Sequence, residues 1–176
     1  MGDRGGLIDL HNLLRQSSVR LCDPRNPAHW GTAFFVASDV MLTCWHVVRD
    51  VPDQRVLVQQ PKPNPTTEGD ALPMALGEAI LLERGDPWDL ALLVFTPTGN
   101  AAGSDGERTE TVVLPLQEHD PSLGSRLVTS AYPKDAASRH DAIYEAAGRT
   151  TPRGQLQEFL RIKADGVVPG FSGSAL

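Results

Sequence analysis

The first half of the chain alternates short apolar runs with turn-forming segments rich in Pro, Gly, Asn and Asp. Such runs, with their β-branched and aromatic side chains, are typical of strands. They occupy residues 18–22, 31–38, 40–45, 55–60, 77–83 and 89–95. A different pattern precedes them, because Leu7, Leu10, Leu13 and Leu14 recur at intervals of three and four. This spacing predicts a short amphipathic helix over 7–16, within a helical extension at 1–16.

A second series of strands follows the polar, Gly-rich segment 97–110, which we interpret as a linker between two halves. Its apolar runs are 111–116, 125–133, 142–150, 155–164 and 167–176. No helix-length periodic segment lies between the strands to make the crossover connections that a parallel sheet needs. The pattern therefore favours an all-β fold of two antiparallel barrels or a sandwich, with units at 17–96 and 111–176.

Composition and charge narrow the class of protein. Of the 176 residues, 40% are hydrophobic and 22% are charged, which is typical of a globular domain. The 16 Gly and 14 Pro favour turns over long helices. The net charge is −6 and the chain contains no run of Lys or Arg, so neither nucleic acid nor an anionic membrane is expected as a partner.

The N-terminal residues argue against export. Asp9, His11 and Arg15 interrupt the segment where a secretion signal needs a continuous apolar core, and no apolar stretch is long enough to cross a bilayer. We therefore expect a cytoplasmic protein. In that compartment Cys22 and Cys44, the two cysteines of the chain, are expected to be reduced thiols rather than a disulfide.

Three residues together are candidates for nucleophilic catalysis. His46 follows an apolar strand, Asp89 opens the most apolar strand, and Ser172 lies between Gly170 and Gly173. Each alone has an ordinary structural explanation: a histidine at a strand end, a solvent-facing acid or a glycine turn. Together they supply what a serine nucleophile needs, which is a base to remove its proton and a carboxylate to orient that base.

Metal or cofactor chemistry is not predicted. The chain contains neither C-x-x-C nor H-E-x-x-H, and no close pair of His residues stands at the spacing of metal ligands. We therefore expect no cofactor and no metal, and hydrolysis that EDTA leaves unchanged.

Four segments, GTAFFV, LTCWHVV, DLALLVF and PGFSGSAL, occur in the order of the motifs of chymotrypsin-like (trypsin-like) serine peptidases. The chain resembles this family, and its bacterial, HtrA-like branch in particular, from about residue 17 to 176. The resemblance implies a chymotrypsin-like double antiparallel β-barrel, with His46 and Asp89 from the first barrel and Ser172 from the second. It implies a serine endopeptidase in which His46 is the general base, Asp89 orients it, and the N–H groups of Gly170 and Ser172 form the oxyanion hole.

Departures from the family concern activation and specificity. Phe171 precedes the nucleophile where the digestive members have an Asp that pairs with a freed N-terminus, so this kind of zymogen activation is not expected. Gly166 stands at the position whose Asp gives trypsin its preference for Lys and Arg, and Asp165 is one residue away. Asp165 is either brought into the pocket by a shifted loop or is a solvated turn residue. The disulfide that flanks the catalytic His in secreted members is not reproduced.

The chain ends four residues after Ser172, whereas the family continues through strands that complete the second barrel. We therefore expect a second barrel without its last strands, completed by C-terminal regulatory domains of a longer protein or by a partner chain. The leading hypothesis is an intracellular, regulatory serine endopeptidase that acts on a protein or peptide substrate. The alternative is a catalytically silent module that binds peptides or partners through its cleft; a β-sandwich interaction domain with coincidental motifs is the third hypothesis.

Overall fold

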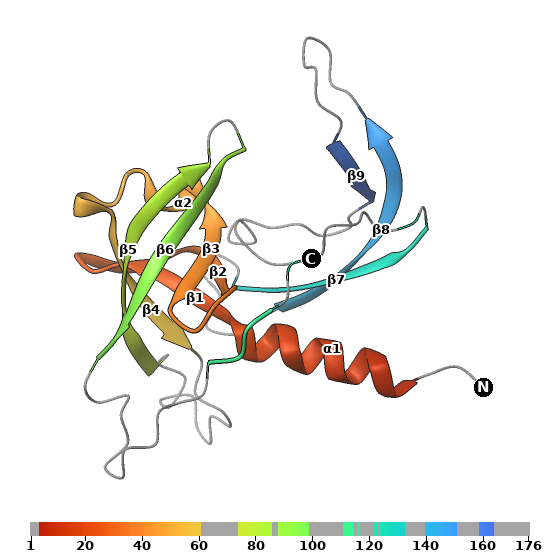
Figure 1. The fold of residues 1–176 in the computed structure, drawn as a ribbon, viewed down its shortest axis with the longest axis horizontal. Coiled ribbons are helices and arrows are strands. Elements are labelled where there is room, and N and C mark those ends of the chain that lie inside the picture. Colours follow the sequence, from red (N-terminus) through yellow and green to blue (C-terminus); the bar gives the residue numbers. More distant parts are fainter. Residues whose placement is uncertain are drawn as a thin grey trace.

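The computed structural model describes residues 4–60, 74–85, 88–98, 111–114, 116, 122, 124–132, 140–150 and 159–163. In these residues the chain is mostly β, with helix α1 (Arg4–Ser17), the single-turn helix α2 (Trp45–Val48) and the 3₁₀ turn η1 (Pro52–Gln54). Figure 1 shows the strands in two groups, a barrel from the first half and a smaller sheet from the second, with α1 extending away from the barrel beneath the sheet. Among the described helices, none has the length and apolar character to span a membrane.

Six antiparallel strands close into a barrel in the order β1-β2-β3-β6-β5-β4. They are β1 (Ser18–Asp23), β2 (Asn26–Phe35), β3 (Val40–Cys44), β4 (Arg55–Gln60), β5 (Met74–Gly85) and β6 (Leu90–Pro97). Each corresponds to a strand predicted from the sequence, but β2 begins earlier than predicted. The turn before it is tight because the Asp23 carboxylate accepts the Arg25 N–H at 2.8 Å, and this local bond closes the chain within two residues.

The barrel interior is apolar because alternate residues of each strand point inward. In β4, for example, Val56 and Val58 are fully buried whereas Arg55 is exposed. Helix α2 closes part of this core with Val47 and Val48. The buried cluster also includes Val19, Leu21, Ala33, Phe35, Met41, Val51, Leu76, Ala79, Ala91 and Leu93.

The second half contributes an antiparallel sheet in the order β7-β8-β9, with β7 (Arg126–Ala131), β8 (His140–Thr150) and β9 (Phe159–Lys163). The described residues thus contain a closed first barrel and part of a second, which confirms the predicted fold class. The predicted strand at 111–116 is wrong, because residues 111–114 and 116 belong to no strand. Leu114 instead donates its N–H to Phe35 O (2.9 Å) and buries its side chain, and Pro115 lacks the N–H that a ladder needs. The predicted strand at 167–176 lies outside the described residues.

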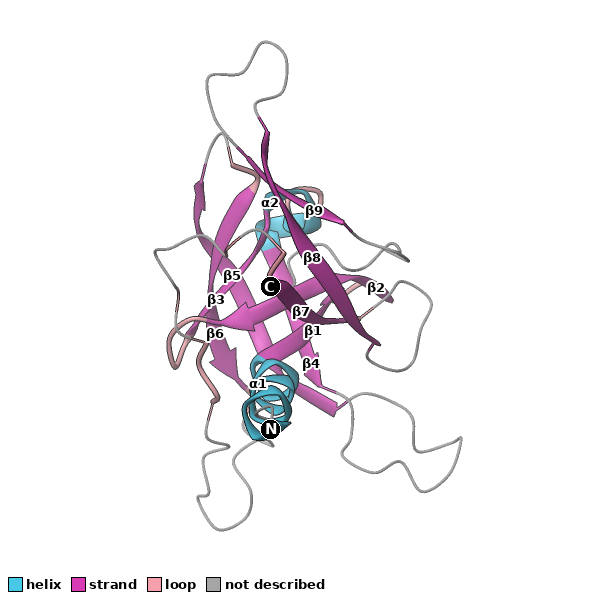
Figure 2. Cartoon of the chain, turned by 90° about the vertical axis from the view of Figure 1, so that its right-hand side faces the viewer, coloured by secondary structure: helices cyan, strands magenta, loops and turns pink. Residues whose placement is uncertain are grey.

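The two strand groups are joined by an apolar cluster and a short series of hydrogen bonds. The cluster consists of Leu14, Phe34, Leu114 and Val128. Tyr132 is the residue that follows β7. Its N–H donates to the Thr32 hydroxyl at 3.0 Å, and its hydroxyl donates to Ser18 O at 3.4 Å. Viewed from the side in Figure 2, β7 lies beside β1 and above α1. These contacts attach the second sheet to the β1–β2 face of the barrel.

Candidate active site

Helix α2 presents His46 to solvent from an anchored backbone. The neighbouring Val47 and Val48 are buried in the barrel core, whereas the His46 side chain is 42% exposed. On the other side, Trp45 packs against the same core, and the Arg84 guanidinium lies over its ring, 5.7 Å from the centroid. The Arg49 N–H closes the turn by donating to Trp45 O at 3.0 Å. The backbone of His46 is therefore fixed while its ring remains accessible.

Asp89 is brought to His46 by the pairing of β3 with β6. The register places Cys44, the last residue of β3, opposite Leu90, the first residue of β6. The residues just beyond these strand ends therefore meet, and Trp45 N–H donates to Asp89 O at 2.8 Å. Asp89 has a left-handed backbone with a φ of 54°, a conformation that Asp tolerates better than most residues.

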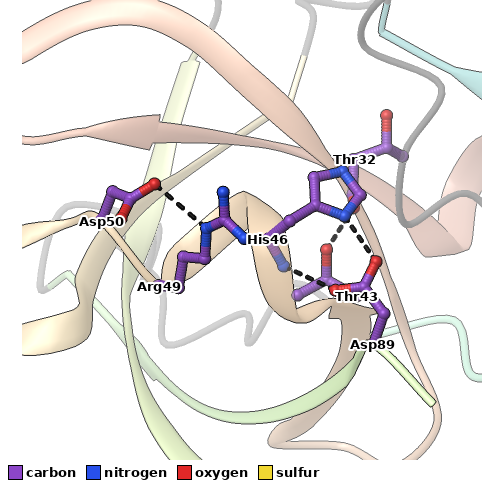
Figure 3. Close-up of polar contacts among 6 residues, drawn as sticks. All are labelled: Thr32, Thr43, His46, Arg49, Asp50 and Asp89. Atoms are coloured by element: carbon purple, nitrogen blue, oxygen red, sulfur yellow. Dashed lines mark hydrogen bonds and ion pairs between the residues drawn. The ribbon is translucent and has the colours of Figure 1, made fainter. Parts of the chain in front are cut away.

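The Asp89 carboxylate holds His46 by two atoms. Its Oδ1 accepts the His46 backbone N–H at 2.9 Å, and its Oδ2 lies 2.5 Å from His46 Nδ1. Figure 3 shows the carboxylate facing the imidazole ring. Because a carboxylate only accepts, Nδ1 is the donor and the neutral ring keeps its lone pair on Nε2. The arrangement produces a histidine of fixed orientation whose Nε2 is ready to take a proton.

A buried hydrogen bond lies behind this pair. The Thr43 hydroxyl in β3 donates to Thr32 O in β2 at 2.7 Å, and the Thr32 hydroxyl accepts the N–H of Tyr132. The strand end that carries α2 is thereby connected to the second half of the chain. Sequence reasoning missed both threonines, and the available signal was a polar residue inside each of two apolar strands. Arg49 and Asp50, which pair at 3.2 Å, lie apart from the His46–Asp89 pair in Figure 3.

Sequence reasoning also missed Cys44 as a possible metal ligand beside His46 and Asp89. Ligand atoms of Cys44, His46 and Asp89 all lie within 4.8 Å of one another. Thiolate sulfur, imidazole nitrogen and carboxylate oxygen are the three atom types that bind zinc in proteins. The C-x-H spacing was visible in the sequence, but the third donor becomes a neighbour only when β3 pairs with β6. Neither Cys22 nor Cys44 is in a disulfide.

The structure brings together two of the three residues predicted as catalytic, His46 and Asp89. The other predicted site residues lie outside the described part of the chain. They are the nucleophile Ser172 with Gly170 of the oxyanion hole, its neighbour Phe171, and the specificity positions Asp165 and Gly166.

Comparisons with known proteins agree with this fold. A family model described as a trypsin-like peptidase domain matches residues 31–176. The serine endoprotease from Yersinia pestis has a similar structure, with 18% identity, a TM-score of 0.62, and coverage of 94% of this chain and 52% of that one. The chain thus spans about half the length of the Yersinia structure. No curated protein matches the sequence significantly.

Two structures of the Rv3671c protease are also similar. Its inactive form is 17% identical with a TM-score of 0.64, and the match covers 99% of this chain and 78% of that one. The inactive form of a serine-to-alanine mutant, from M. tuberculosis H37Rv, gives 18% identity, a TM-score of 0.60, and coverage of 99% and 76%. At these identities the structural likeness shows the fold. The family match shows in addition to which family the chain belongs, because it spans most of the chain and includes His46, Asp89 and Ser172. The chain therefore belongs to the trypsin-like peptidase domain family.

Proposed function

We propose that the chain is a serine endopeptidase that hydrolyses peptide bonds of a protein or peptide substrate through Ser172, His46 and Asp89. The observation that carries the proposal is the contact of 2.5 Å between His46 Nδ1 and Asp89 Oδ2. The second bond, from the His46 backbone N–H to Asp89 Oδ1, supports it because it fixes the carboxylate relative to the backbone that carries the ring. A base must be oriented in this way to act on a neighbouring hydroxyl.

In the first step of the proposed reaction, Ser172 Oγ attacks the carbonyl carbon of the scissile bond while His46 Nε2 takes the hydroxyl proton. The imidazole becomes a cation, and the Asp89 carboxylate beside Nδ1 stabilises it. The negative charge that develops on the carbonyl oxygen is stabilised by the N–H groups of Gly170 and Ser172. In enzymes of this kind one such donor contributes about 10²–10³ in rate.

In the second step the carbon–nitrogen bond breaks, and His46 gives its proton to the leaving amine. The acyl group remains bonded to Ser172 Oγ. Water then attacks this ester, and His46 takes a proton from the water and returns it to Ser172 as the acid product leaves. His46 thus accepts one proton and donates it again in each half of the reaction.

We also propose that the protein works in a reducing compartment, the cytoplasm. Support comes from Cys22 and Cys44, which form no disulfide, since reduced thiols persist where the glutathione and thioredoxin systems operate. When freshly lysed cells are denatured in the presence of an alkylating reagent, so that the buried Cys22 is also accessible, alkylation of both thiols is the expected result.

Labelling with a fluorophosphonate probe tests the nucleophile directly. We expect the full-length protein to be modified once, at Ser172, as mapped by mass spectrometry. Ser174→Ala is the matched control, because Ser174 lies in the same GFSGSAL segment, and this variant should still react. Ser172→Ala should not react. Equal labelling of Ser172→Ala would remove Ser172 from this role, and a folded, unlabelled wild type that still binds peptides would favour the silent binding module.

A further inference from the structure

We propose that Cys44, His46 and Asp89 form a binding site for a thiophilic divalent cation such as Zn²⁺, and that the bound cation inhibits the peptidase. The inhibitory consequence rests on the function proposed above, whereas the metal site itself does not.

The distances between the donors suit such an ion. Bond lengths of about 2.3 Å to sulfur and 2.0–2.1 Å to nitrogen or oxygen, in a tetrahedron, place the donor atoms about 3.4–3.6 Å apart. The donor atoms of Cys44, His46 and Asp89 already lie within 4.8 Å of one another. The His46 and Asp89 side chains are 42% and 48% exposed, so small side-chain rotations bring the three into range. Three protein ligands leave the fourth position for water.

The barrel holds the donors on adjacent backbone segments. Cys44 ends β3, His46 follows it in α2, and Asp89 comes directly before β6. The paired register of Cys44 with Leu90 joins the two segments, and Val47 and Val48 anchor α2 in the core. The fold thus assembles the three donors before any cation binds, and this preorganisation favours binding.

The donor types select the class of cation. Ca²⁺ and Mg²⁺ prefer shells of oxygen ligands, and Asp89 contributes the single carboxylate of this group. A thiolate and an imidazole instead favour Zn²⁺ and its spectroscopic substitute Co²⁺. The chemistry therefore points to thiophilic transition-metal ions.

Coordination of His46 through either ring nitrogen blocks its proposed role. If the cation binds Nδ1, it displaces the hydrogen bond to Asp89 Oδ2, and the ring loses its orientation. If it binds Nε2, it occupies the lone pair that takes the Ser172 proton. In both cases the proton transfer stops, and a chelator is expected to restore it.

Cys22 provides the matched control. It is fully buried, its thiol donates to Gln59 Oε1 at 3.1 Å, and burial raises the pKa of the Cys22 thiol despite the opposing effect of Arg20. Ionisation to the thiolate, which metal binding requires, is therefore disfavoured at Cys22. A single thiol remains in each of the variants Cys22→Ala and Cys44→Ala, so the comparison isolates the position of the sulfur.

Titration of the full-length protein with Co²⁺, followed by near-ultraviolet absorption, tests the site without reference to activity. We expect wild type and Cys22→Ala to develop a sulfur-to-cobalt charge-transfer band that saturates at one ion per chain and disappears on addition of Zn²⁺. Cys44→Ala and Cys44→Ser should show no band. Their Zn²⁺ affinity should fall on the order of 100-fold or more, since loss of an outer-shell contact alone costs 10–100-fold. Circular dichroism identifies the variants that fold.

The outcomes separate the metal site from the function. The absence of a band in wild type, or a band that survives in Cys44→Ser, would overturn the site. With hydrolysis measured relative to each protein's metal-free rate, Zn²⁺ should inhibit wild type and Cys22→Ala but not Cys44→Ala. Co²⁺ bound through Cys44 to an active enzyme without inhibition would overturn the inhibitory role. Co²⁺ bound to a protein that hydrolyses nothing would refute the proposed function and leave the metal site standing.

Discussion

The six-stranded barrel and the three-stranded sheet differ in how their strands are paired. In the barrel every strand has two neighbours, because β1 pairs with both β2 and β4 and closes the ring. In the described part of the second half, β8 is paired on both sides, whereas β7 and β9 are each paired on one. Closure removes the unpaired edges that an open sheet retains. The barrel is therefore the more self-sufficient of the two regions.

The buried side chains of the two regions show the same difference. The core of the barrel is made by its own strands, α2 and the adjoining Val51. Val128 of β7 instead packs against Leu14 of α1 and Phe34 of β2. The His46–Asp89 pair is thus oriented within one unit, whereas the position of the second half depends on its attachment to the barrel.

Removal of the base should give the largest effect and should leave the barrel intact. We expect His46→Ala to lower kcat by several orders of magnitude, and Asp89→Asn by about 10⁴-fold, because the serine loses its oriented base. Since the His46 side chain is substantially exposed, the free energy of unfolding of His46→Ala should change by about 0.5 kcal/mol or less. Steady-state kinetics and urea denaturation measure the two quantities. Near-full activity of His46→Ala would refute its role as base.

Truncation of one leucine in each region should lower the free energy of unfolding more in the barrel than in the sheet. Leu93 is fully buried in the barrel core. Leu93→Ala should lower the free energy of unfolding by about 2–5 kcal/mol. Leu127 in β7 is half-buried, and Leu127→Ala should cost about 1 kcal/mol. Urea denaturation of both variants gives the comparison, with the exposed Leu82→Ala as a control. Equal costs for Leu93→Ala and Leu127→Ala would mean that the sheet has an independent core.

Loss of the attachment between the regions should cost less than truncation of the barrel core at Leu93. Thr32→Val leaves the buried Tyr132 N–H without its hydroxyl acceptor, at a cost of about 1–3 kcal/mol. Tyr132→Phe removes the longer bond to Ser18 O and should cost less. Hydrogen exchange should accelerate at the β7 amides of Thr32→Val while the amides of Val56 and Val58 stay protected. Uniform acceleration across both regions would show that they open as one unit.

Local pattern predicted the strands of the barrel well. The bounds of β4 are those predicted, 55–60, because alternating burial leaves a period-two signal in its sequence. The strand predicted at 111–116 failed for the opposite reason, since its apolar side chains mark a packing contact of Leu114 rather than a ladder. Apolar character reports burial, and burial at a junction between regions has no fixed period.

The sequence by itself indicated an all-β fold and the strands of the barrel through side-chain periodicity, and His46 and Asp89 as candidates through residue type. The choice of a double barrel over a sandwich came from the resemblance to a known family. Only the tertiary structure decided their contacts. The hydrogen bond from His46 to Asp89 spans 43 residues and that from Tyr132 to Thr32 spans 100. The approach of Cys44 to the His46–Asp89 pair likewise depends on the register of β3 against β6. Register and barrel closure are set by the pairing of distant segments, which no local stretch of sequence encodes.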